Sequence, residues 1–114
     1  MSERGLLVAA DLVYAAALAA MVAASLWVAP QIATDTVPMQ WGLDGKPTWY
    51  APKEVGLWFT VGLAVVLRVV MLLQAQWGAP RRRKVAMGLM VFSVIVAVVH
   101  AGHLVAVMRW AATQ

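Results

Sequence analysis

Three long apolar stretches alternate with short polar segments along the chain. They run from about Leu6 to Ala29, from about Val55 to Trp77 and from about Val85 to Trp110. An α-helix needs about 20 apolar residues to cross a hydrocarbon core of about 30 Å, and each stretch reaches that length. The pattern therefore predicts three transmembrane helices, at residues 6–29, 55–77 and 85–110.

The composition requires lipid as part of the solvent. Of the 114 residues, 63% are hydrophobic and only 12% are charged, which is more apolar side chain than a soluble domain of this size buries. The chain has no cysteine, which excludes disulfides and thiolate metal sites. We expect an all-α membrane protein in which residues 1–114 form a single integral membrane domain, with the lipid bilayer as its first partner.

The first stretch is a candidate signal peptide because it lies at the amino terminus. It is too long for the apolar region of a cleaved signal, and the start Ser2-Glu3-Arg4 has no net positive charge. We therefore expect it to remain in the protein as a transmembrane helix.

The basic residues predict the orientation in the membrane. Four of the nine cations form one run, Arg81 to Lys84, inside a short predicted loop at residues 78–84, and such loops face the cytoplasm. This places the amino terminus inside, and the loop at residues 30–54 and the carboxyl terminus outside. The same run explains the net charge of +4 without nucleic-acid binding. We expect a multi-pass protein of the bacterial inner membrane.

Two opposite charges lie inside the predicted helices. Asp11 and Arg68 both fall in the inner half of the membrane, where an unpaired charge costs about 3 kcal/mol. We expect them to form an interhelical ion pair. A proton or ion path, or independent snorkelling to the headgroups, remains open.

Two histidines lie three residues apart in the third helix. His100 and His103 share one face, and a metal site would need further ligands such as Asp35 or Asp44. The alternative is that each imidazole hydrogen-bonds a neighbouring helix. We predict no cofactor and no metal, with these histidines as the weak candidates for a metal site.

Small residues repeat at helical spacing in the first and third stretches, and small residues allow helices to approach closely in lipid. The sequence leaves open whether these series form contact faces, including faces of a homo-oligomer, or are apolar filler. The series are Ala16, Ala20 and Ala24; Ala15, Ala19 and Ala23; and Ser93, Ala97 and Ala101.

The loop at residues 30–54 is too long to be a passive connection, and its Trp and Pro content predicts a fixed shape. Residues 37–41 read as an extended segment, and Leu43 to Lys46 as a turn in which Gly45 adopts a positive φ. Pro52 suits the first turn of the second helix.

A motif in this loop resembles that of the SdpI-like membrane proteins, typically I-P-x-H-W-N-x-x-G followed by an aromatic residue and a lysine. Here it reads VPMQWGLDG, and the matching positions are Pro38, Trp41, Gly45, Tyr50 and Lys53. In that family the motif belongs to a domain of unknown function and follows the first transmembrane helix. Gln40 replaces the usual histidine, and its amide neither titrates nor ligates metal well.

The resemblance implies a partner-binding loop made of Pro38, Gln40, Trp41, Gly45, Tyr50 and Lys53. Full-length relatives have a second membrane half, and the characterised type is an immunity protein against a secreted peptide toxin that also sequesters a repressor. This chain ends after three predicted helices.

Three function classes follow. We favour a non-enzymatic protein whose outer loop recognises a membrane or extracytoplasmic protein or peptide, as an immunity factor or as an accessory subunit of a membrane complex. The alternatives are a transport or channel component that uses the intramembrane Asp, Arg and His residues, and a metal-binding membrane protein centred on the histidines.

Overall fold

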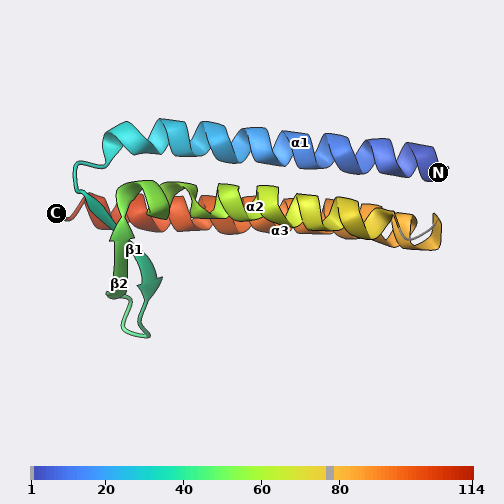
Figure 1. Ribbon diagram of the computed structural model, residues 1–114. Coiled ribbons are helices and arrows are strands. Elements are labelled where there is room, and N and C mark those ends of the chain that lie inside the picture. The colour runs from blue at the N-terminus through green and yellow to red at the C-terminus, as the bar shows by residue number, and fades with distance from the viewer. Residues whose placement is uncertain (1, 77–78) are drawn as a thin grey trace.

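The computed structural model contains three long helices, one short 3-10 helix and a two-stranded sheet, and it describes residues 2–76 and 79–114. The three long helices lie side by side, and the β-hairpin projects crosswise to them where α1 ends and α2 begins (Figure 1). The elements are α1 (Glu3–Val28), η1 (Ala29–Gln31), β1 (Thr36–Trp41), β2 (Pro47–Pro52), α2 (Lys53–Ala75) and α3 (Ala79–Ala111).

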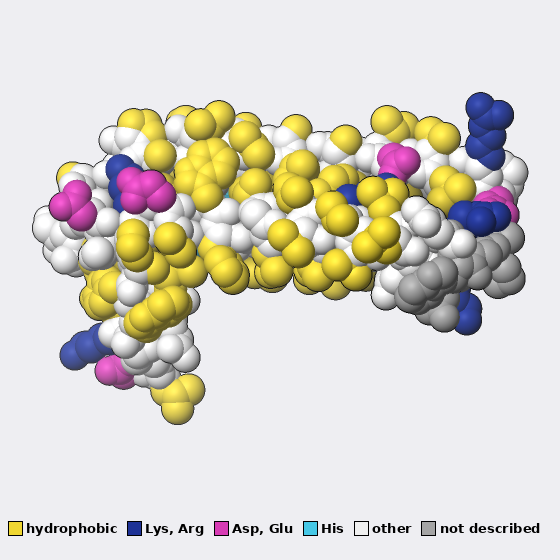
Figure 2. Space-filling model, in the orientation of Figure 1, with side chains coloured by type: hydrophobic (Ala, Val, Ile, Leu, Met, Phe, Trp, Pro, Cys, Tyr) yellow, Lys and Arg dark blue, Asp and Glu magenta, His cyan; other side chains and the backbone are white. Residues whose placement is uncertain are grey.

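All three long helices are long and apolar enough to cross a membrane. Large apolar side chains remain exposed along them, for example Leu12 on α1 and Val98 on α3, each 65% exposed. Apolar side chains cover the flank of the bundle, while most charged side chains lie toward its two ends (Figure 2). These are the features of a multi-pass membrane protein.

Helix α3 is the centre of the bundle, because α1 packs mainly against it and α2 also lies along it. Its buried positions recur every three or four residues, which is the spacing of a seam between nearly parallel helix axes. The buried residues of this seam are Ala86, Leu89, Ser93, Val96, His100, Leu104 and Val107.

The alanine series of α1 do not form its contact face within the chain. Ala15, Ala19 and Ala23 are exposed, as are Ala16 and Ala20. Helix α1 instead buries three larger apolar residues, one serine and one alanine that belongs to neither series. The buried residues of α1 are Leu6, Ala10, Met21, Ser25 and Val28.

The two-stranded sheet corrects the all-α prediction. Strand β1 pairs antiparallel with β2, whereas the sequence pattern predicts only one extended segment, at residues 37–41. Pro47 and Pro52 bound β2 and hide its strand signal, since proline cannot donate to a ladder. The sheet tolerates them because both of its strands are edges. Pro52 accordingly ends β2, and α2 begins at Lys53.

The predicted inner loop at residues 78–84 is wrong from residue 79 onward, and residue 78 lies outside the described residues. Helix α3 begins at Ala79, so the basic run lies within its first two turns. Arg and Lys are good helix formers, and the end of an apolar stretch therefore does not mark the end of the helix.

Helix α1 begins at Glu3, close to the amino terminus of the chain. The Ser2 hydroxyl caps this helix, because it accepts a hydrogen bond from the Gly5 N–H at 3.0 Å.

Candidate functional site

The hairpin turn is closed by local hydrogen bonds. The Gly42 N–H donates to the Lys46 carbonyl at 2.8 Å, and the Gly45 N–H donates to the Gly42 carbonyl at 3.0 Å. Gly45 has φ +80°, in the region that side chains disfavour. The Asp44 carboxylate accepts from the Lys46 N–H at 3.0 Å. The turn therefore has one defined conformation, with Gly45 in the role that the sequence assigns to it.

Lys53 closes the base of the hairpin. Its Nζ donates to the Ile32 carbonyl at 2.6 Å, and its backbone N–H donates to the Asp35 carbonyl at 2.8 Å. Both acceptors precede β1, while Lys53 follows β2. This motif residue therefore joins the two ends of the loop.

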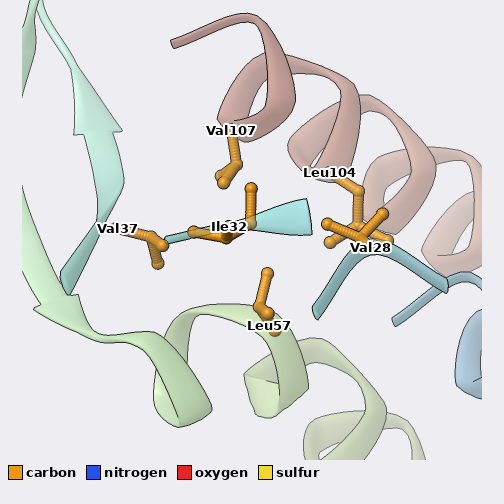
Figure 3. Close-up of a cluster of buried hydrophobic side chains, with 6 residues drawn as sticks. All are labelled: Val28, Ile32, Val37, Leu57, Leu104 and Val107. Carbon is orange, nitrogen blue, oxygen red and sulfur yellow. The ribbon is translucent and has the colours of Figure 1, made fainter. Parts of the chain in front are cut away.

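Gly56 lets α2 approach β1. A Cβ at this position would lie 2.0 Å from Cγ2 of Val37, which is far inside van der Waals contact. Val37 is fully buried in a cluster that also contains Ile32 and Leu57 (Figure 3). The hairpin is thus fixed by packing as well as by hydrogen bonds. The sequence analysis missed Gly56, and a glycine inside a predicted helix was its only signal.

The predicted loop residues divide between the base of the hairpin and its open part. Lys53 lies at the base, and Pro38 is buried opposite Tyr50 in the ladder. Gln40 and Gly45 are exposed, and Trp41 is half-buried. The Tyr50 ring packs against Trp110 of α3 with centroids 5.8 Å apart.

The open part of the hairpin exposes apolar side chains. Leu43 at the turn is fully exposed, Trp49 is 55% exposed and Tyr50 is 45% exposed. Trp49 and Leu43 are further residues of this surface that the motif did not indicate.

A polar relay links the three helices just below the hairpin. The Ser25 hydroxyl donates to the Leu57 carbonyl at 2.7 Å, and its oxygen lies 2.9 Å from Nε2 of His100. Since the serine proton is already used, Nε2 of His100 carries a proton and donates it to Ser25. Nδ1 of His100 is then a bare acceptor, and it has no partner among the described residues. Sequence reasoning missed Ser25 because a single serine in an apolar helix carries no specific signal.

His103 makes a separate contact from α3 to α2. Its Nε2 lies 2.8 Å from the Gly56 carbonyl, and a carbonyl only accepts, so Nε2 is the donor. Each histidine thus hydrogen-bonds a neighbouring helix. Within residues 2–76 and 79–114 no three His, Asp or Glu side chains gather as a metal-binding group, so Asp35 and Asp44 do not join the histidines.

The structure brings Asp11 and Arg68 together. Nη2 of Arg68 donates to Oδ1 of Asp11, and the guanidinium lies 5.7 Å from the centre of the Tyr14 ring. The Tyr14 hydroxyl donates to the Ala64 carbonyl at 3.2 Å. The Arg68 side chain is 17% exposed and that of Asp11 is 61% exposed. The pair therefore lies at the outside of the α1–α2 contact.

Apolar residues separate this ion pair from the histidine relay. Tyr14 and Ser25 are about 16 Å apart along α1, at about 1.5 Å per residue. The interior between them holds the buried cluster of Met21, Val61, Ala64 and Val96. In the described part of a single chain, the two polar groups do not form one continuous path.

Comparison with known proteins gives one family match. The family model described as "Domain of unknown function (DUF1648)" matches residues 16–65. No curated protein and no solved structure matches the chain. The matched segment runs from the middle of α1 through the whole hairpin to the middle of α2, so the chain is similar to this domain in the part that carries the anchored hairpin.

Proposed function

We propose that this chain is a non-enzymatic protein of the bacterial inner membrane whose hairpin recognises a protein or peptide outside the cytoplasm. The observation that carries the proposal is a hairpin fixed at its base and open at its tip. Lys53 and the contact of Gly56 with Val37 hold the base, while Leu43 and Trp49 remain exposed.

This combination favours binding. Exposed aromatic side chains supply much of the energy of protein interfaces, and a rigid support lowers the entropy lost when a partner binds. The half-buried polar groups next to the hairpin, Lys53 and His103, donate to backbone carbonyls. Such contacts hold the fold together, and this supports recognition rather than catalysis.

The distribution of charge supports the proposed orientation. The end of the bundle that holds the amino terminus and the start of α3 (Figure 1) carries five basic residues, namely Arg4 and Arg81 to Lys84, and one acidic residue, Glu3. The hairpin end carries three of each sign: Lys46, Lys53 and Arg109, with Asp35, Asp44 and Glu54. The positive-inside rule then assigns the amino terminus to the cytoplasm, and the hairpin and carboxyl terminus to the outside.

We further propose that the chain is a short SdpI-like protein, acting as an immunity factor or as an accessory subunit. The motif residues support this, since Lys53 holds the base of the hairpin, Pro38 is buried in β1 and Gln40 is exposed on the same strand. With glutamine at position 40, recognition at this position depends on hydrogen bonds of an amide and does not change with protonation.

Photocrosslinking tests the proposal. A photoreactive amino acid replaces Leu43 in native membranes, and a comparison variant carries it at Val98, which is also exposed but lies in the middle of α3. We expect position 43 to give a discrete protein adduct and position 98 to give lipid adducts. Trp49→Ala and Gly45→Val should abolish the adduct while membrane insertion stays normal. Lipid adducts alone at both positions would overturn the proposal.

A further inference from the structure

A groove lies between the hairpin and the end of α3. Its volume is about 490 Å³, which is within the range of small-molecule sites. The hairpin contributes Trp41 and Lys46 to its lining, α3 contributes Arg109 and Trp110, and Thr113 follows the end of α3. The groove therefore combines two cations, two indole rings and a hydroxyl group, and its walls come from segments about 60 residues apart in sequence.

The two cations are available to a ligand. Lys46 and Arg109 are exposed, and among the residues that the structure describes neither forms a salt bridge. Arginine binds phosphate through a planar fork of N–H groups, and lysine binds it as a point charge. Asp44 is the nearest acid along the chain, but it does not line the groove, and its carboxylate accepts from the Lys46 backbone N–H.

The position of the groove indicates where the anion comes from. The candidate membrane span of α3 ends at Ala111, so a bilayer around this helix would place Arg109 and Trp110 near the end of the hydrocarbon region, where tryptophan is enriched at the headgroup level. The hairpin projects crosswise to the helices (Figure 1). It therefore runs along the membrane surface, and the groove beside it opens at the depth of lipid phosphates.

We infer that this groove binds the phosphate headgroup of an anionic phospholipid. Lys46 and Arg109 contact the phosphate, and Trp41 and Trp110 flank the glycerol part of the headgroup. The lipid joins the turn of the hairpin to the end of α3. This site requires membrane insertion, but it does not depend on a protein partner for the exposed tip.

Lipid crosslinking tests the inference on the full chain in phosphatidylcholine vesicles. Trace phosphatidylglycerol with a photoactivatable group near the headgroup is the probe, and the same group on phosphatidylcholine is the reference. Adducts are mapped to residues 41–47 and 106–113. We expect the anionic probe to label these segments about tenfold more than the reference. The double variant Lys46→Gln, Arg109→Gln should lower labelling to the level of the reference.

The matched control removes two cations from the opposite end of α3. Arg83 and Lys84 are also exposed, and Arg83→Gln with Lys84→Gln should leave labelling of the groove unchanged. An equal loss of labelling in both double variants would mean that net charge alone attracts the anionic probe, and this result would overturn the inference. Equal labelling by the two probes would also overturn it.

Two further measurements cover the remaining outcomes. An excess of soluble glycerol 3-phosphate should not displace the probe, and displacement would assign the groove to a free phosphate compound instead of a lipid. If circular dichroism shows that the groove variant does not fold, the salt dependence of labelling in the wild-type protein tests the role of the two cations. Raising the salt concentration should lower labelling of these two segments by the anionic probe, and labelling that is independent of salt would refute the role of the cations.

Discussion

The Ser25 hydroxyl oxygen lies 2.9 Å from Nε2 of His100 and donates its own proton to the Leu57 carbonyl at 2.7 Å. One hydroxyl group thus connects α3, α1 and α2. Ser25 is fully buried and His100 is 1% exposed, so water cannot replace either partner. The relay lies directly below the hairpin and fixes the helices that support it.

Removing this hydroxyl should destabilise the bundle. Ser25→Ala leaves the His100 Nε2–H buried without an acceptor, and we expect a loss of about 1 to 2 kcal/mol in the free energy of unfolding. Unfolding by SDS in mixed micelles measures it. Ser93→Ala is the matched control, because Ser93 is equally buried but bonds only the Leu89 carbonyl of its own helix at 2.6 Å. Similar losses in the two variants would contradict the relay.

The Asp11–Arg68 pair predicts that removing one charge lowers stability more than removing both. Asp11→Ala alone leaves the largely buried Arg68 without its partner, and we expect it to cost about 2 to 3 kcal/mol of stability. Changing Asp11 to Ala and Arg68 to Met together should cost less, since no charge is left unpaired. The same unfolding assay compares the variants.

A second ion pair serves as the control for the first. Glu3 and Arg82 meet at 3.0 Å at the end of the bundle, with side chains 34% and 41% exposed. Because water solvates this end, Glu3→Gln should cost less than about 1 kcal/mol. Equal costs for Asp11→Ala and for the double variant would show that Asp11 and Arg68 do not depend on each other.

The contact of Gly56 with Val37 predicts a steric effect that a second change relieves. Gly56→Ala places a methyl group 2.0 Å from Cγ2 of Val37, and we expect a loss of about 1 to 3 kcal/mol and faster proteolysis of the hairpin. In a Val37→Ala background the same change should cost much less, because the next atoms are 3.4 and 3.5 Å away.

Gly62→Ala provides the control in the same helix. No atom lies within 4 Å of a Cβ at position 62, and alanine favours helix over glycine, so stability should stay equal or rise. Thermal unfolding in mild detergent checks all four variants. A cost for Gly56→Ala that is the same with and without Val37 would exclude the steric explanation.

The proposed orientation predicts opposite labelling at the two ends. The chain has no cysteine, so Asp44→Cys and Arg83→Cys each introduce a single thiol. An impermeant maleimide added to intact cells should label position 44, and it should label position 83 only after permeabilisation. Labelling of position 83 in intact cells with position 44 protected would invert the orientation.

Much of the fold is readable from local patterns. Apolar stretches of membrane-spanning length predict the three helices, and the Asp-Gly turn predicts the positive φ of Gly45. The start of α3 differs from the prediction and the strand β2 is not predicted, each for its own physical reason. Hydropathy reports where lipid can surround a helix, but it does not report where backbone hydrogen bonding begins, and prolines hide a strand that has only one partner.

The residue pattern along the chain is enough to read the chemistry that the protein carries: three apolar spans, opposite charges at Asp11 and Arg68, two histidines and a loop with a defined turn. Beyond the expected meeting of Asp11 and Arg68, the contacts between distant groups follow from the tertiary structure. The relay through Ser25, the approach of Gly56 to Val37 and the groove between Lys46 and Arg109 join residues from 19 to 75 positions apart. Such contacts depend on how the helices rotate about their axes and on the direction of the hairpin, and local residue patterns do not encode either.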